Sequence, residues 1–189
     1  MPGHTPGLAL PYDPEQACRL LAEAGYLEGR GMPPLRIWYM TPEMGAATAD
    51  LLREALPVEV ELHQVAPLHL RDDVAGCHLL FDGWTADLPD PDNFLRHSQV
   101  LGILRKAGWH DPELYALLDR AAHTPDRACR MAMYRQADRR LVTEQALLVP
   151  LIYGRLRALL QPRVSGARPS KMSFFRLKDV VVEKHALAE

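Results

Sequence analysis

A tryptophan and an acidic residue lie three positions apart in GWTADLPDPDNF, residues 83–94, directly after the apolar run CHLLFD. An indole can stack on a ligand and exclude water. A carboxylate in that drier setting attracts an ammonium group more strongly than it would in water. We therefore predict that Trp84 and Asp87, with their neighbours Gly83 and Thr85, bind a ligand at the mouth of a cleft. The structural alternative is that Asp87 forms a turn and that Trp84 belongs to a core.

Metal binding is not indicated by the other polar residues. Calcium sites use six to eight oxygen ligands at fixed intervals, and the acids at 82, 87, 90 and 92 are interrupted by prolines that restrict the backbone. These acids are therefore expected in solvated turns and helix caps. His63, His69 and His78 could meet in space, but the sequence has no HExxH pairing. We expect no metal and no other cofactor.

Enzymatic chemistry is likewise unsupported. The serines lie in no GxSxG motif, and the glycines at 29 and 31 precede prolines instead of opening a phosphate-binding helix. The three cysteines, Cys18, Cys77 and Cys129, are far apart and form no CxxC pair, so we expect them to be small buried hydrophobic residues. The sequence predicts a binding protein, not an enzyme.

Length and charge narrow the class further. The chain has 189 residues, which suggests one domain, and its net charge of -2 argues against a nucleic-acid partner. No run of about 18 apolar residues predicts a membrane span. The opening residues lack the basic and apolar regions of a signal peptide, so a cytoplasmic location stays open. Residues 1–10, rich in Pro and Gly, are typical of a linker before a domain at 11–189.

Four segments combine a helix start with an apolar face. Asp-Pro or Thr-Pro pairs at 13, 41 and 111 supply a cap followed by proline in the first turn, and a longer helix follows Thr124. Gly25 and Pro57 end the first two helices. The predicted inner faces are Ala17, Leu20, Leu21 and Ala24; Met44, Ala47, Leu51, Leu52 and Ala55; Leu114, Leu117, Leu118 and Ala121; and Cys129, Ala132 or Met133, Ala137 and Leu141.

Strand patterns alternate with these helices. Residues 58–65 alternate between apolar and polar, which favours a half-buried strand, whereas 77–84 are more continuously apolar and therefore predicted to be central. Pro150 restricts a further strand to an edge or a bulge. The candidates are 35–40, 58–65, 77–84 and 147–153, with weaker ones at 155–160 and 179–183. This order predicts an α/β fold with a mixed β-sheet flanked by helices, where ligands bind beyond the carboxyl ends of strands.

Five segments in this order resemble one known family: YDPEQACRLLAEAGY, FDGWTADLPDPDNFL, DPELYALLDRA, RMAMYRQADRRLVTEQALLVPLIYGRLRALLQPRVSG and LKDVVVE. Together they resemble the C-terminal lobe of the family 5 extracellular solute-binding proteins, the oligopeptide-, dipeptide- and nickel-binding receptors of bacterial ABC importers. The resemblance runs from about residue 11 to about residue 184. GWTADLPDPDNF is the most specific element, being close to the family's usual Gly-Trp-x-Ala-Asp-Tyr-Pro-Asp-Pro.

The resemblance implies one lobe of a two-lobed, class II periplasmic-binding-protein-like fold that closes over its ligand. It implies that Asp87 occupies the position that pairs with a peptide's α-ammonium group, and that Trp84 matches the family's cleft tryptophan. It further implies an extracytoplasmic location, an importer permease as partner, and an N-terminal lobe that this chain does not contain.

Two departures from the family pattern put the ligand's length and class in question. Leu88 replaces the usual tyrosine after the acid, and no basic residue directly precedes Trp84. The segment PSKMSFFR, residues 169–176, is a candidate return toward the second lobe. An alternative function is a ligand-sensing domain in a cytoplasmic, multidomain regulatory protein that reuses the same lobe.

Overall fold

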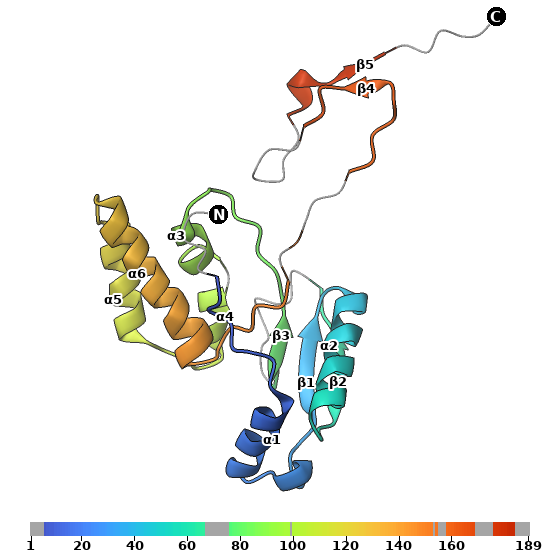
Figure 1. The fold of residues 1–189 in the computed structure, drawn as a ribbon, viewed down its shortest axis with the longest axis vertical. Helices are drawn as coiled ribbons and strands as arrows, with labels where there is room; N and C mark the ends of the chain where they lie inside the picture. The colour runs from blue at the N-terminus through green and yellow to red at the C-terminus, as the bar shows by residue number, and fades with distance from the viewer. Residues whose placement is uncertain are drawn as a thin grey trace, which may run out of the picture.

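The computed structural model describes residues 6–66, 76–98, 100–152, 154, 158–168 and 176–183. Helices and strands alternate along much of this part of the chain, which confirms the predicted α/β class (Figure 1). In order, the elements are α1 (Pro14–Glu23), η1 (Leu27–Gly29), β1 (Leu35–Tyr39), α2 (Pro42–Ala55), β2 (Val60–Gln64), β3 (Leu79–Phe81), α3 (Pro91–Leu95), α4 (Val100–Lys106), α5 (Pro112–Ala122), α6 (Arg127–Arg139), η2 (Arg140–Glu144), β4 (Val164–Ser165), η3 (Leu177–Asp179) and β5 (Val181–Val182).

The main sheet has the strand order β2-β1-β3, and both pairings are parallel. Leu35 pairs with Val60, and Ile37 pairs with Leu79. The prediction that 77–84 form a central strand was wrong for the described sheet, because β1 lies in the middle and β3 is short. Within β3, Leu79 is 38% exposed, whereas Leu80 and Phe81 are half-buried.

Helix α2 packs against β1 and β2 through its smallest residues (Figure 1). Gly45 and Ala49 are buried, and a Cβ atom at Gly45 would lie 2.5 Å from Cγ of Tyr39. The predicted inner face was wrong at Ala47 and Leu51, which are exposed, whereas Met44, Leu52 and Ala55 are half-buried. The close approach of the helix to the Tyr39 ring decides which face turns inward.

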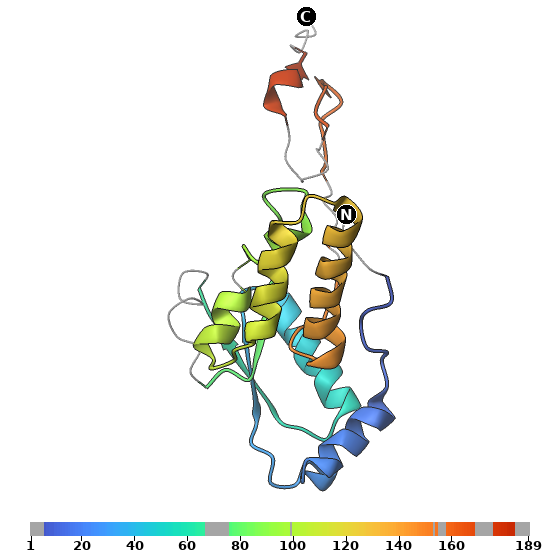
Figure 2. The same cartoon turned by 90° about the vertical axis from the view of Figure 1, so that its left-hand side faces the viewer.

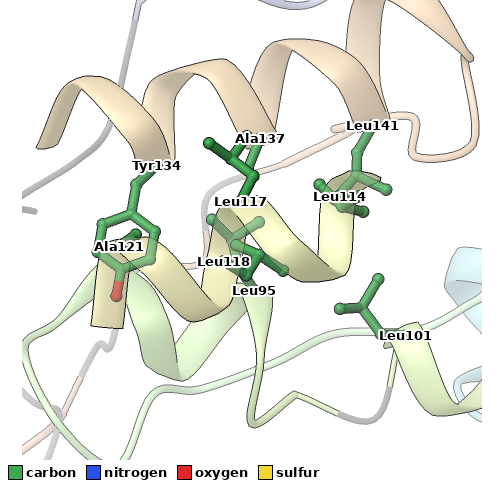
Figure 3. Packing of buried hydrophobic residues seen from close by; sticks show 9 residues of the cluster. All are labelled: Leu95, Leu101, Leu114, Leu117, Leu118, Ala121, Tyr134, Ala137 and Leu141. Atoms are coloured by element: carbon green, nitrogen blue, oxygen red, sulfur yellow. The ribbon is translucent and has the colours of Figure 1, made fainter. Parts of the chain in front are cut away.

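The principal hydrophobic core lies among the helices, where α5 and α6 run side by side (Figure 2). All four residues predicted for the inner face of α5 are buried, which confirms that prediction. For the last helix, Ala137 and Leu141 are buried as expected, but Cys129 is exposed and Tyr134 takes the inward position. Figure 3 shows Tyr134, Ala137 and Leu141 beside the leucines of α5.

Helix α1 starts as predicted, since Oδ1 of Asp13 accepts a hydrogen bond of 2.8 Å from the Gln16 backbone N–H. Gly25 has φ +95°, the left-handed conformation expected after the helix. None of its side chains is buried, however, and Leu20 is 53% exposed. The cap of α1 was predictable because it depends only on residues next to it in the sequence. Burial of the apolar face of α1 depends instead on another element packing against it.

The structure also bears on the remaining strand and cysteine predictions. Residues 147–152 form no strand, and Val149 and Ile152 are exposed, since no described strand pairs with them. The segment 179–183 does contribute β5, which pairs antiparallel with β4 in a separate small sheet. Cys18 is exposed and Cys77 half-buried, so neither is a fully buried hydrophobic residue. Residues 155–157 and 169–175 lie outside the described residues.

Candidate functional site

The candidate residues lie in the segment that leaves the carboxyl end of β3 and leads to α3 (Figure 1). Trp84 is half-buried, whereas Gly83, Thr85 and Asp87 are exposed. Between them, Ala86 is only 4% exposed and anchors the segment to the body of the protein. This alternation presents the Asp87 side chain outward at the end of a strand, where ligands of α/β proteins tend to bind.

A buried amide joins the two principal candidates. Oδ1 of Asn93 accepts a hydrogen bond of 3.0 Å from Nε1 of Trp84 and another of 3.1 Å from the backbone N–H of Asp87. Asn93 is 5% exposed and lies in the first turn of α3. The structure thus brings Trp84 and Asp87 together through a residue that the sequence analysis did not single out.

The acids that follow have structural partners, as predicted for turn and cap residues. Asp90 caps α3, its Oδ1 accepting from the Asp92 backbone N–H at 2.9 Å. Nη2 of Arg130 lies 2.8 Å from the same oxygen. Within the described part of the chain, no three histidine, cysteine or acidic side chains gather as metal ligands. Of the three histidines considered, His69 lies outside the described residues.

A second polar cluster lies at the start of α5. Asp111 caps the helix by accepting from the Leu114 backbone N–H at 3.0 Å, and it also accepts from Arg140 and Gln145. Burial opposes ionisation of Asp111, but these hydrogen bonds outweigh burial and hold its pKa below its usual value. Gln145 in turn accepts from Nε1 of Trp109 at 3.1 Å. The cluster borders an open hollow of about 520 Å³, and its polar groups satisfy one another.

Two hollows on the described surface do not include Trp84 or Asp87. One borders the Asp111 cluster, and the other, of about 510 Å³, lies between the loops around Gly31 and Pro57. What the candidate segment offers is an open surface: a half-buried indole and an exposed carboxylate on a hydrogen-bonded backbone. Such a surface can attract a cation, but a second wall is needed to exclude water from it.

Sequence reasoning missed Asn93 because an asparagine two residues after a proline looks like part of the turn. A signal was nevertheless present. Asn93 follows Asp90 and Pro91, a cap and first-turn pair, which places it inside a helix where asparagine is unfavourable. An asparagine there predicts that its amide has a specific partner.

The chain matches no protein-family profile, but it is similar to curated binding proteins. It is 33% identical over 172 residues to "Probable di/tripeptide-binding protein 5" of Pseudomonas aeruginosa, covering 84% of this chain and 31% of that protein. It is 31% identical over 183 residues to "Heme-binding protein A" of Haemophilus influenzae, covering 92% and 33%. The chain thus spans about a third of the length of the curated relatives it matches.

Solved structures show the same fold. The OppA protein of Burkholderia pseudomallei superposes with a TM-score of 0.73 at 23% identity, over 90% of this chain and 35% of that one. The DppA protein of Helicobacter pylori, solved with the peptide STSA, superposes with a TM-score of 0.69 at 25% identity, over 92% and 35%.

These matches define the class first: the chain has the fold of part of a two-lobed periplasmic binding protein. Within that class the matched relatives are family 5 solute-binding proteins, as the sequence resemblance indicated, and this chain is similar to about a third of their length. Among the described helices, none is long and apolar enough to cross a membrane.

Proposed function

We propose that this chain is the C-terminal lobe of a receptor that captures a peptide, or another small solute carrying an ammonium group, for an ABC importer. The observation that carries the proposal is that Asp87 is exposed in the segment after β3 and that its backbone N–H shares the Asn93 acceptor with the Trp84 indole. Capture is non-covalent: the carboxylate pairs with the ligand's ammonium group, and Trp84 covers the apolar part next to it.

A second lobe supplies the other wall of the cleft in this proposal. The chain spans about a third of its relatives' length, which leaves room in the intact protein for that lobe. When the lobes close, water leaves the Asp87 carboxylate, and its attraction for an ammonium group grows. The receptor acts outside the cytoplasm and hands its ligand to an importer permease, without catalysis.

The regulatory alternative has less support. The relatives described above are named as binding proteins, and their names point to no cytoplasmic sensor. A multidomain regulator would use the same pairing of Asp87 with a ligand. The two functions differ in what adjoins the lobe, because a receptor needs the second lobe and an export signal, whereas a sensor needs a signalling domain.

The proposal is tested in the intact two-lobed protein with tripeptide libraries, one with free amino termini and one N-acetylated. Wild-type protein is expected to retain free-amine peptides preferentially, as measured by mass spectrometry of the bound fraction. Asp87→Ala should abolish that preference, because the ammonium group loses its partner. Glu23→Ala, which removes an exposed carboxylate from α1, is the control and should bind like the wild type. An unaltered preference in Asp87→Ala would remove Asp87 from the site.

The 189-residue chain alone offers a second test. Because a lobe without its partner makes only part of the ligand's contacts while the cost of association remains, we expect dissociation constants weaker than about 1 mM. Calorimetric titration with the same free-amine tripeptides checks this value. Micromolar binding by the isolated chain would contradict a cleft shared between two lobes.

A further inference from the structure

We propose that Asn93 is the positioning residue of the ligand site, holding Trp84 and Asp87 in one fixed arrangement through a single carboxamide oxygen. The inference rests on the function proposed above and assigns a role to a side chain that the ligand itself need not touch. It follows from three features of the structure: the geometry of the two hydrogen bonds, the burial of Asn93 and the attachment of α3.

The geometry is a three-residue junction. The indole Nε1 of Trp84 and the backbone N–H of Asp87 both donate to Oδ1 of Asn93, at 3.0 and 3.1 Å. A carbonyl oxygen has two lone pairs, so one amide oxygen can accept both bonds. The indole and the backbone of the acid are thereby fixed relative to each other by one atom.

The acceptor of this junction is buried. Asn93 is 5% exposed and Ala86, between the two donors, is 4% exposed. Water therefore has little access to replace the amide oxygen, and removing the oxygen would leave two donors without their partner. The Asp87 side chain stays exposed while its backbone is held, which is the arrangement expected of a group that must face a ligand.

Asn93 lies on helix α3, which is attached to α6. The backbone N–H of Asn93 donates to the Asp90 carbonyl oxygen at 3.1 Å, and the Asp90 side chain accepts from Arg130 of α6 at 2.8 Å. Pro91 and Leu95, on the same short helix, are buried. The helical core therefore holds α3 in place, and Asn93 on α3 in turn holds the two candidate ligand-binding residues.

Substitutions at Asn93 separate positioning from simple stabilisation. Asn93→Leu keeps approximate size but removes the acceptor, whereas Asn93→Asp keeps an oxygen at the same place and should rescue the site. Leu95→Ala is the matched control, because it weakens the same helix by opening space in the core and leaves the junction intact.

The first measurement is hydrogen exchange of the indole N–H groups in this chain. Asn93→Leu should exchange the Trp84 indole proton at least tenfold faster, and Asn93→Asp should restore slow exchange. The Trp109 indole, which donates to Gln145 at 3.1 Å, is an internal reference that should not change. An unchanged Trp84 rate in Asn93→Leu would overturn the junction.

The second measurement is the preference for free-amine over N-acetylated tripeptides in the intact receptor. We expect Asn93→Leu to reduce that preference at least tenfold, Asn93→Asp to retain it, and Leu95→Ala to retain it despite a lower midpoint of unfolding. If Leu95→Ala loses the preference equally, Asn93 is merely structural and the inference is wrong.

The two proposals fail differently. If Asp87→Ala loses the preference and Asn93→Leu keeps it, Asp87 remains the ligand's partner and the role of Asn93 is refuted. If the wild type retains no peptide or shows no preference, or if Asp87→Ala keeps the preference, the proposed function fails and the inference fails with it.

Discussion

The hydroxyl group of Tyr134 donates a hydrogen bond of 2.8 Å to Oδ1 of Asp92, which joins the middle of α6 to the first turn of α3. One helical turn earlier, Arg130 binds Asp90 at 2.8 Å and lies 5.2 Å over the Tyr134 ring. Tyr134 is itself 1% exposed. Helix α6 therefore holds the start of α3, the helix that carries Asn93, and so helps to position the segment that contains Trp84 and Asp87.

Removing the Tyr134 hydroxyl group should destabilise the protein. Tyr134→Phe keeps the ring in the core but leaves Asp92 without its buried donor, and hydrogen bonds to charged groups contribute about 1.5–3 kcal/mol. We expect a loss of that order in the free energy of unfolding, measured by urea denaturation. Tyr12→Phe is the control, since Tyr12 is 79% exposed. Equal stability of the two variants would contradict a buried bond between α6 and α3.

Because the pKa of Tyr134 is raised, we expect the folded protein to lose stability at high pH. Burial raises the pKa of Tyr134 from 10.0 to about 12, and the hydrogen bond to Asp92 adds to the rise. Below pH 10 both states hold the proton, so the stabilisation is complete. As pH rises through 12, the unfolded state ionises first, and the stabilisation is lost. A two-unit difference corresponds to roughly 3 kcal/mol.

The measurement is the free energy of unfolding between neutral pH and pH 12, compared between wild type and Tyr134→Phe. Other groups titrate at high pH in both proteins, so the difference between the two curves isolates Tyr134. Wild type should lose more stability than the variant above pH 10. Parallel curves over this interval would show that Tyr134 ionises equally in the folded and unfolded states.

Local features of the fold were readable from the sequence. Asp13 and Asp111 cap helices as predicted, because a cap acts on backbone groups only a few residues away. The inner face of α5 was also predicted in full, since four apolar residues at helical spacing define one side without competition. Asp87 and Trp84 were singled out by residue type and by resemblance, and their binding role stays a prediction.

Features set by distant partners were not readable. The inward face of α2 depends on the Tyr39 ring meeting Gly45, a contact between a strand and a helix. Tyr134, not Cys129, lies inside the core, and its hydroxyl donates to Asp92, 42 residues away. Asn93 likewise acquires its role from folding, through one donor that is nine residues distant. The spacing of apolar residues indicates which helix faces could be buried, but contacts with distant residues determine which face is buried.

Substitution of Asp111 should lower the free energy of unfolding more than substitution of most other polar residues. It caps α5 and accepts from Arg140 and Gln145 with only 5% exposure. Asp111→Ala removes the acceptor of the Leu114 backbone N–H and of the Gln145 amide, while Arg140 keeps its ion pair of 2.9 Å with Glu113. We expect a loss of about 1.5–3 kcal/mol in the free energy of unfolding, the scale of hydrogen bonds to charged groups. Chemical denaturation checks this value.

The matched control for Asp111 is Asp126→Ala, which removes an exposed cap from the neighbouring helix. Asp126 accepts from the Cys129 backbone N–H at 2.8 Å but forms no ion pair with an arginine of the described residues. Its loss should therefore be clearly smaller than that of Asp111→Ala. If the two losses were equal, the contacts of Asp111 with Arg140 and Gln145 would contribute nothing beyond capping.

Two glycines within helices should respond in opposite directions to alanine. Alanine favours a helix over glycine by about 1 kcal/mol. At Gly102 of α4 an added Cβ meets nothing within 4 Å, so Gly102→Ala should raise the free energy of unfolding. At Gly45 the Cβ would lie 2.5 Å from the Tyr39 ring, so the gain in propensity is outweighed by displacement of α2 from the sheet. Thermal denaturation of both variants decides the matter: a stabilised Gly45→Ala protein would show that α2 does not pack against β1 through this glycine.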